Sequence, residues 1–336
     1  MTDISNIQTT KKTPIVAVVG STASGKTALS IALAKIYGGE IVSCDSMQIY
    51  RYMDIGTAKP TMDERQGIPH HLIDFVDPTD PHGYSCADYV RDARRVVDDI
   101  VSRGKLPILC GGTGLYLDAF LRGGSFDTTQ VDTALRQELT DFVEREGAEA
   151  LHAMLRDLDP QAAENIHPNN VKRVMRAIEI CKSTGSTKTA LDMASREQDC
   201  PYDALVVGLR YHDRQVLYGR IEARVDQMID MGLVEETKRL RAMGVFETCP
   251  TAAQAIGYKE LFPYLDGEAT MGQVTDVLKT ATRRYAKRQM TWFYAKPYVR
   301  WVDADTPLPE GGVKDFEDIV NNTQKLFSSV GFCGIL

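Results

Sequence analysis

The sequence lacks several features that mark common classes of protein. Its seven cysteines are scattered, and no two of them form a C-x-x-C pair, so the spacing typical of a zinc site is missing and a disulfide framework is unsupported. No apolar run approaches the roughly 20 residues of a membrane-spanning helix, and the polar N-terminus has no apolar signal core. These absences predict a cytoplasmic protein with reduced thiols and no membrane partner.

An excess of positive charge is also missing. The 336 residues include 46 acidic side chains against 39 lysines and arginines, which gives a formal net charge of −7. A chain with this balance is not a generally basic nucleic-acid binder, so any nucleic-acid site must be a local patch. The length allows one large domain with an insertion, or two domains.

What the sequence does contain is a phosphate-binding loop. The motif G-x-x-x-x-G-K-[ST] stands between an apolar run at 14–19, which predicts a buried strand, and a helical pattern at 28–37. In that setting glycines let backbone N–H groups surround phosphate oxygens, the lysine adds positive charge, and the final hydroxyl is placed to bind Mg²⁺. The predicted phosphate-binding residues are Gly20, Ser21, Thr22, Ala23, Ser24, Gly25, Lys26 and Thr27, with Thr27 as the metal ligand.

Strands and helices then alternate, as in a doubly wound α/β fold. The patterns predict strands at 14–19, 40–44, 70–76, 105–110, 203–211 and 299–302, and helices at 28–37, 85–103, 114–121, 213–231, 233–243, 251–265, 270–295 and 312–329. Between 125 and 195 every segment has a helical pattern, with helices at 131–146, 147–158, 169–183 and 187–194. We therefore expect a P-loop nucleotide-kinase-like parallel sheet flanked by helices, spanning 14–122 and 200–330, with an all-helical insertion at 123–199.

Two polar groups are predicted at the carboxyl edge of this sheet, where open α/β folds bind ligands. Asp45 follows the strand at 40–44, and Thr113 lies in a second glycine turn after the strand at 105–110. A carboxylate in that place can bind Mg²⁺ through water or act as a general base. The alternative role for Asp45 is that of a helix N-cap or turn residue.

Three other groups of residues have less certain roles. Arg220 and Arg224 stand four apart and can clamp a diphosphate, although their spacing alone favours a solvated helix face. Residues 279–300 contain seven basic and no acidic side chains, interleaved with aromatic ones, a mixture that suits single-stranded nucleic acid. The pair His70 and His71 has no third ligand at metal-site spacing, so packing or loop anchoring is the favoured interpretation.

The signatures of nucleotide switches and motors are missing. No N-K-x-D or D-x-x-G pair occurs in a GTPase setting, and no strand ending in an acidic pair follows as in motor ATPases. The single carboxylate and the hydroxyl at the sheet edge favour a group-transfer enzyme instead.

The chain resembles the tRNA dimethylallyltransferases, also called tRNA isopentenyltransferases. The most specific matching stretches are Gly56-Thr-Ala-Lys-Pro60 and Lys287-Arg-Gln-Met-Thr-Trp292. The others lie at 20–27, 43–50, 53–60, 69–74, 111–116, 166–169 and 255–260, so the resemblance runs almost end to end. Ser21 departs from the proline that many members carry, in a variable part of the loop.

This resemblance implies transfer of a dimethylallyl group from dimethylallyl diphosphate to N6 of the adenosine on the 3′ side of the tRNA anticodon. Asp45 is implied as general base, and Thr22, Lys26 and Arg224 as catalytic residues that bind the diphosphate, with Mg²⁺ as cofactor at Thr27. The tRNA anticodon stem-loop is the implied partner. Its implied contacts are Asp45, Ser46, Met47, Gln48, Thr113, Arg136, Lys172, Arg173, Val174, Met175, Arg176, Gln254, Ala255, Ile256, Gly257, Tyr258, Lys259, Arg284, Lys287 and Arg288.

Three alternatives remain open. A cytokinin-type adenylate isopentenyltransferase would use a free nucleotide as acceptor, a P-loop nucleotide kinase would bind ATP, and a binding module without activity would hold RNA. The helical insertion and the basic, aromatic helix argue against the first, because a free nucleotide needs neither. A monomer is the default expectation.

Overall fold

The described residues of the chain form two compact units. The computed structural model describes residues 12–80, 83–122, 132–197, 199–305 and 316–332. One unit is drawn from Met1–Phe120 and Tyr202–Leu336, and the other from Leu121–Pro201. Among the described residues, no helix is long and apolar enough to cross a membrane.

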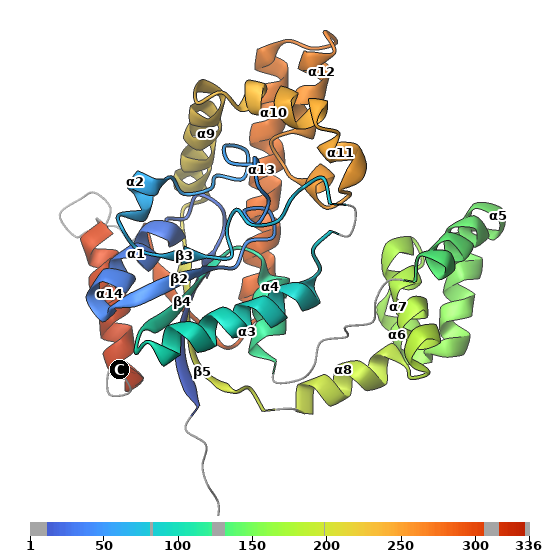
Figure 1. Cartoon of the computed structure of the whole chain (residues 1–336), viewed down its shortest axis with the longest axis horizontal. Helices are drawn as coiled ribbons and strands as arrows, with labels where there is room; N and C mark the ends of the chain where they lie inside the picture. Colours follow the sequence, from blue (N-terminus) through green and yellow to red (C-terminus); the bar gives the residue numbers. More distant parts are fainter. Residues whose placement is uncertain (1–11, 81–82, 123–131, 198, 306–315, 333–336) are drawn as a thin grey trace, which may run out of the picture. The chain divides into compact units, whose positions relative to one another are not determined.

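The larger unit is built on a six-stranded, wholly parallel sheet with the order β3-β2-β4-β1-β5-β6 (Figure 1). The strand before the P-loop, β1, lies at the centre between β4 and β5. Because all strands run the same way, the segments that follow them meet at one edge of the sheet. The strands are β1 (Thr13–Gly20), β2 (Gly39–Ser43), β3 (His70–His71), β4 (Leu106–Gly111), β5 (Tyr202–Arg210) and β6 (Val299–Asp303).

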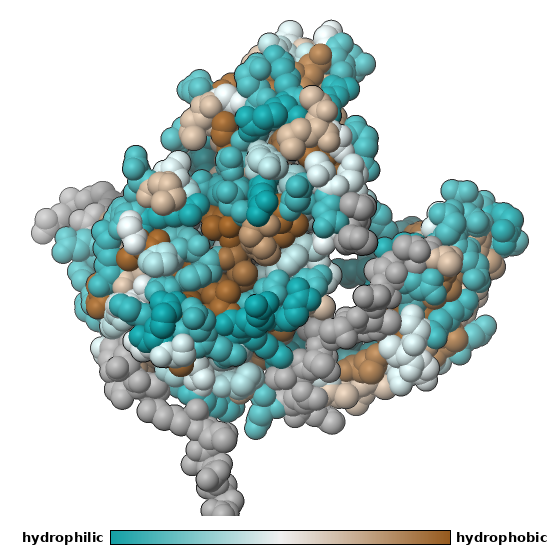
Figure 2. All heavy atoms as spheres, in the orientation of Figure 1, coloured by the Kyte–Doolittle hydropathy of each residue, from teal (hydrophilic) through white to brown (hydrophobic). Residues whose placement is uncertain are grey.

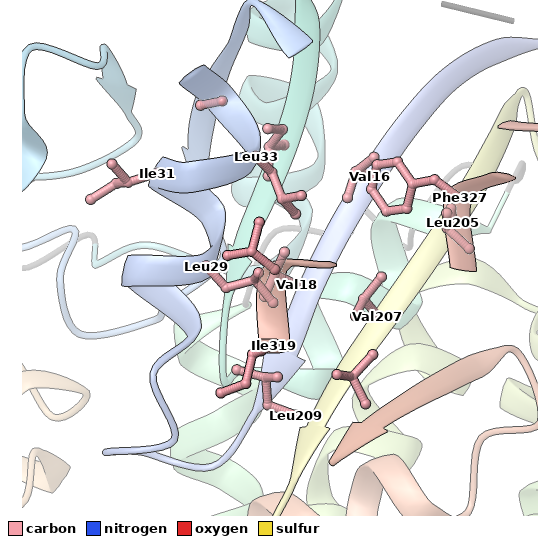
Figure 3. Packing of buried hydrophobic residues seen from close by; sticks show 14 of the residues in the cluster. Val16, Val18, Leu29, Ile31, Leu33, Leu205, Val207, Leu209, Ile319 and Phe327 are labelled. Atoms are coloured by element: carbon pink, nitrogen blue, oxygen red, sulfur yellow. The ribbon is translucent and has the colours of Figure 1, made fainter. Parts of the chain in front are cut away.

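Helices cover the sheet, which confirms the predicted α/β class. On one face, α1 (Lys26–Tyr37) and α14 (Phe316–Ser329) pack their apolar side chains onto the strands. Figure 3 shows Leu29 of α1 beside Val18 of β1, and Phe327 of α14 beside Val16 and Leu205. Residues 15–20 of β1 and 205–209 of β5 are buried, as is usual in parallel sheets. The helices α3 (Cys86–Ser102) and α4 (Gly114–Leu121) follow β3 and β4 in the chain, and α3 packs on β2 and β4.

A second apolar cluster lies in the part of this unit built from residues 47–76 and 214–294. Its fully buried members include Tyr50, Met53, Leu240 and Tyr258. In the view of Figure 2, most of the surface is polar, and apolar side chains gather beside α3. The elements of this part are α2 (Met62–Arg65), α9 (Arg214–Asp230), α10 (Leu233–Ala242), α11 (Val245–Thr248), α12 (Phe262–Leu265) and α13 (Met271–Tyr294).

The smaller unit is all helical in its described residues and has its own core. Leu139, Leu151, Val174 and Ile178 pack together there. Gly147, with a positive φ of 86°, breaks the first helix where the sequence pattern changes. The helices are α5 (Thr133–Leu158), α6 (Pro160–Asn165), α7 (Val171–Thr184) and α8 (Lys188–Glu197).

Three sequence-based predictions of elements are wrong. The strand expected at 70–76 has only two residues, because Leu72 and Asp74 adopt left-handed φ values of 55° and 61° that a strand cannot accommodate. The helix expected at 251–265 is broken at Gly257, whose φ is 116°, into two 3₁₀ turns and α12. The short helix α2 lies at 62–65, where the sequence patterns predicted neither a helix nor a strand. The predicted helix starts at 131 and 312 lie outside the described residues.

The paired histidines anchor the segment after β2. The Nε2 atom of His71 lies 2.8 Å from a carboxylate oxygen of Glu40, and Nδ1 of His70 lies 2.8 Å from the carbonyl oxygen of Ile68. Arg103 also hydrogen-bonds to Glu40. Together, the hydrogen bonds from Arg103 and His71 lower the pKa of the Glu40 carboxyl to about 2. Both histidines therefore have structural partners.

Candidate active site

A cavity of about 400 Å³ lies at the carboxyl edge of the sheet in the larger unit. The P-loop after β1, the segment after β2 and the end of β4 form one side of its lining. The remainder comes from the loop 56–58, the loop 254–259 and the helices α9 and α13. The sheet thus delivers the predicted phosphate loop and the predicted carboxylate to one space.

The P-loop is held in a conformation that directs its lysine into the cavity lining. Gly25, with a φ of 95°, immediately precedes α1, and a Cβ atom added at Gly20 would meet the carbonyl oxygen of Leu209 at 2.9 Å. Glycine is therefore required at both places. The Nζ atom of Lys26 donates to the carbonyl oxygen of Ser21 at 2.5 Å, and burial lowers the pKa of Lys26 to about 8.

Arg220 of α9 contacts the P-loop and Arg224 lines the cavity, which the interpretation of their spacing as a solvated helix face did not predict, although Arg220 remains exposed. Nε of Arg220 donates to the carbonyl oxygen of Ala23 at 2.9 Å. Arg224 lines the cavity, its Nη2 lies 3.4 Å from the carbonyl oxygen of Ala58, and burial lowers its pKa. Among the described side chains, no carboxylate forms an ion pair with Lys26 or Arg224. Two half-buried cations without an ionic partner among the described side chains make this part of the cavity suited to an anion.

Asp45 serves as a turn residue and also lines the cavity. Its Oδ1 accepts hydrogen bonds from the backbone N–H groups of Met47 at 2.9 Å and Gln48 at 3.3 Å. Within the described chain, its Oδ2 accepts no hydrogen bond, and the carboxylate lies in the same lining as Lys26 and Arg224. One oxygen therefore fixes the side chain while the other is available to a proton donor in the cavity.

The second glycine turn braces the segment that carries Asp45. The N–H of Thr113 donates to the carbonyl oxygen of Cys44 at 3.2 Å, and its Oγ1 accepts from the N–H of Ser46 at 3.0 Å. A Cβ atom added at Gly111 would lie 1.9 Å from that same carbonyl oxygen. Thr113 itself does not appear in the cavity lining, so in this structure it positions Asp45 from behind.

Sequence reasoning missed Glu236, a buried carboxylate on α10. Its two oxygens accept from the N–H groups of Asp54, Ile55 and Gly56 at 2.9–3.1 Å and from the hydroxyl of Tyr258 at 2.8 Å. This carboxylate shapes the loop that supplies residues 56–58 to the cavity. A single glutamate on an amphipathic helix carries no local signal of this role, since its three backbone partners lie 180–182 positions away.

Replacing Glu236 by glutamine is expected to lower the free energy of unfolding by about 1–3 kcal/mol, because an amide NH₂ group then faces N–H donors that lose an acceptor. Urea unfolding measures the change. The neighbouring Glu235→Gln is the matched control, since Glu235 is exposed and its partner is the surface residue Lys238, and it is expected to change stability by less than about 0.5 kcal/mol. Equal losses in the two variants would contradict this role of Glu236.

The basic helix predicted at 270–295 is α13, and its cations fall into two groups. Three of the seven basic residues at 279–300 form ion pairs with acids from other helices: Lys279 with Asp226, Arg283 with Glu222, and Lys296 with Asp118. The segment contains no acidic residues, but acidic residues elsewhere pair with three of its cations, so fewer of them are unpaired than the sequence suggested. Arg284, Lys287 and Arg288 are exposed on one face and form no ion pair with any described residue.

The aromatic residues of this segment differ in burial, since Tyr294 and Tyr298 are exposed and the others are not. Phe293 is fully buried, and the Trp292 ring packs where a Cβ atom on Gly114 would otherwise lie. Tyr285 lines the cavity, and the guanidinium of Arg288 lies 5.6 Å from the centre of its ring. Tyr285 is therefore the ring of this segment that the cavity makes available for stacking.

The other predicted tRNA contacts differ in exposure and in whether they line the cavity. Among 254–259, all but Tyr258 line the cavity, as do residues 45–48. In the smaller unit, Lys172 and Arg173 are exposed, and Met175 is half-buried. Arg136 is bound through two nitrogens to the buried Glu179 at 2.7 and 2.9 Å, and Arg176 contacts the same carboxylate at 3.3 Å. Val174 and Tyr258 have fully buried side chains, so neither side chain is exposed to a ligand in this structure.

Comparisons with known proteins identify the family of this chain. The family model described as IPP transferase matches residues 48–296. The tRNA dimethylallyltransferase of Exiguobacterium is 49% identical over 317 residues, which cover 94% of this chain and 99% of that protein. The Bacillus subtilis tRNA dimethylallyltransferase is 48% identical over 297 residues, covering 88% and 93%.

Solved structures share the fold. The tRNA isopentenylpyrophosphate transferase of Bacillus halodurans aligns with a TM-score of 0.67 at 44% identity and covers 95% of this chain and 96% of its own. A eukaryotic dimethylallyltransferase described as acting on tRNA aligns with a TM-score of 0.76 at 31% identity, covering 87% and 74%. The chain therefore belongs to the IPP transferase family, together with the tRNA dimethylallyltransferases.

Proposed function

We propose that this protein transfers a dimethylallyl group from dimethylallyl diphosphate to N6 of the adenosine 3′-adjacent to the anticodon of a tRNA and releases diphosphate. The observation that carries the proposal is the composition of the cavity lining, in which Lys26 and Arg224 face one region together with Asp45. An anion site and a carboxylate within one space suit a reaction in which an anion leaves and a proton is removed.

Stabilising the negative charge of the departing diphosphate is the larger catalytic requirement of this reaction. The bond between the allylic carbon and the diphosphate oxygen breaks, and its electron pair leaves with the diphosphate. Lys26, Arg224 and the P-loop N–H groups are set before the reaction begins, and such preorganised charge stabilises a leaving anion efficiently. In this proposal the hydroxyl of Thr22, from the same loop, also binds the diphosphate.

The proton comes from the adenine. As the N6–carbon bond forms, the amine loses a proton, and Asp45 accepts it on the oxygen that its turn leaves free. The target base must leave the stack of the anticodon loop to reach the cavity, which costs about a few kcal/mol. The apolar side chains of Val225, Met228 and Leu278, also in the lining, suit the hydrocarbon part of the donor.

The residues also fit a Mg²⁺ ion. The hydroxyl of Thr27 is an oxygen donor in the lining, and among the described residues there is no cluster of three or more histidine, cysteine or acidic side chains that could hold a metal. Mg²⁺ is commonly bound by few protein groups together with substrate phosphates. When bound, Mg²⁺ would neutralise part of the charge on the diphosphate.

The pH dependence of donor binding is expected to report on Lys26. Its pKa is about 8 in the free protein, and an anion binds better to the charged form. Above that pH, binding must take up a proton, so the affinity for dimethylallyl diphosphate should fall by up to about tenfold per pH unit between about pH 8 and about pH 10. Calorimetric titration measures it. Lys26→Met should bind weakly and lack this fall; an equal slope in that variant would contradict the assignment.

RNA binding is proposed to use the exposed cations of α13 and, on the smaller unit, Lys172 and Arg173. The double replacement Arg284→Glu with Lys287→Glu should weaken tRNA binding and lower the slope of log affinity against log salt by about 2, one unit for each lost phosphate contact. Fluorescence anisotropy at several salt concentrations measures it. Lys325→Glu on α14 is the control for charge. An unchanged slope in the double variant would mean that this face does not bind RNA.

We further propose that the enzyme acts in the cytoplasm as a monomer, without membrane contact. Labelled dimethylallyl diphosphate incubated with unmodified tRNA or with AMP, with and without ATP, tests the function. Transfer to tRNA without ATP is the expected result. Transfer to AMP alone would indicate an adenylate prenyltransferase, and ATP-dependent phosphorylation would indicate a kinase; either outcome would overturn the proposal.

A further inference from the structure

A single amide side chain joins the two halves of the cavity edge. Gln289 of α13 is only 6% exposed and lies in the cavity lining. Its Oε1 accepts a hydrogen bond from the backbone N–H of Thr22 at 2.8 Å, and its Nε2 donates to the carbonyl oxygen of Gly112 at 3.1 Å. Both ends of the amide are therefore used, one on the P-loop and the other on the second glycine turn.

The second glycine turn is built to admit this side chain. A Cβ atom added at Gly112 would lie 2.0 Å from Nε2 of Gln289, so an alanine there would displace the amide from its present position. The backbone of Gly112 is not left-handed, so the need for glycine comes from space and not from conformation. Gly112 and Gln289 thus form one unit in which the glycine leaves room for the amide.

The two loops joined in this way have different tasks in the proposed reaction. Thr22 belongs to the loop that would hold the departing diphosphate. The turn at Gly112 continues into Thr113, which binds Cys44 and Ser46 on either side of Asp45. The amide of Gln289 therefore connects the P-loop, where the diphosphate would leave, to the turn at residues 112–113. That turn also hydrogen-bonds to the segment that carries Asp45.

We propose that Gln289 is a positioning residue that sets the separation and orientation of the donor and acceptor halves of the site, with Gly112 as its necessary partner. The inference rests on the proposed prenyl transfer. Gln289 touches neither reacting atom in this account; it acts through Thr22 and through the turn that holds Asp45. Geometry of this kind affects the chemical step more than binding, because each substrate contacts mainly its own half.

The test compares Gln289→Met, Gln289→Glu, Gly112→Ala and the double variant Gln289→Met with Gly112→Ala. Methionine keeps the size and loses both hydrogen bonds, whereas glutamate keeps an acceptor for Thr22 but repels the carbonyl of Gly112. In each variant kcat should fall by about 10- to 100-fold. The Kd for tRNA and for dimethylallyl diphosphate should stay within about threefold of wild type. The double variant should be no slower than the slower single one, because both changes remove one link.

Gly272→Ala, at the start of α13 with open space around the added atom, is the control and should keep wild-type kcat. The urea midpoint of each variant separates lost positioning from lost folding, and Gln289→Glu, the closest in size, carries the test if Gly112→Ala is destabilised. Unchanged kcat in the two Gln289 variants, or multiplying losses in the double variant, would overturn the inference. Absence of transfer by the wild-type protein would instead overturn the proposed function itself.

Discussion

Asp45→Ala is expected to lower kcat for prenyl transfer by about 10²–10⁴-fold, the usual contribution of a general base. The reason is that the adenine amine is a weak nucleophile, since its lone pair is delocalised into the ring, and the free Oδ2 of Asp45 is the group placed to take its proton. The Kd for tRNA should change by less than about threefold, because the base acts in the chemical step. Single-turnover kinetics together with a tRNA binding assay measure the two quantities.

Asp45→Asn separates the two roles of this residue. An asparagine oxygen can accept the hydrogen bonds from Met47 and Gln48 and so keep the turn, but the amide cannot accept the proton of the amine as a carboxylate does. The asparagine variant should therefore unfold at the wild-type urea concentration and lose as much activity as the alanine variant. Near-normal transfer by Asp45→Asn would reduce Asp45 to a turn residue, which was the alternative left open by the sequence.

Arg224→Ala is expected to lower kcat/KM by about 10²–10³-fold, comparable to the loss of one preorganised donor at a developing anion. Burial already disfavours the charge of Arg224, as its lowered pKa shows, and it has no ionic partner among the described side chains. An anion bound beside it is therefore stabilised strongly. Arg224→Lys should recover part of the loss, because lysine restores charge without the two-pronged geometry of the guanidinium.

The control for Arg224 lies on the same helix. Arg214 is exposed at the start of α9, so Arg214→Ala removes the same side chain without touching the cavity. Its kcat/KM should stay within about twofold of wild type. Equal losses at the two positions would show that the general charge of α9, and not a diphosphate site at Arg224, explains the effect.

Much of this architecture was predictable because short stretches of the sequence determine it. The strand, loop and helix around Lys26 follow from a short apolar run, a glycine motif and a helical pattern, and the structure has all three in place. The parallel sheet follows from the alternation of strands and helices. The placement of Asp45 at the carboxyl edge follows from counting to the end of its strand, and the cavity contains it. The catalytic roles of these residues remain predictions.

The remaining features depend on contacts between distant parts of the chain. The spacing of Arg220 and Arg224 indicates a helix face, but only the packing of α9 shows that this face meets the P-loop. Glu236 shapes a cavity loop about 180 positions away, and Gln289 reaches back 267 positions to Thr22. The break at Gly257 depends on a left-handed backbone that a helical pattern does not reveal. Such features carry no periodicity, so a sequence pattern cannot report them.

The most direct test of the proposed function is to determine which nucleotide of the tRNA receives the prenyl group. Unmodified tRNA with adenosine on the 3′ side of the anticodon is incubated with the protein, Mg²⁺ and dimethylallyl diphosphate, then digested and analysed by mass spectrometry. A matched tRNA with guanosine at that position serves as control. N6-isopentenyladenosine is expected at that one position, with no modification of the control. Prenylation at another position, or equal prenylation of the control tRNA, would contradict the proposed function.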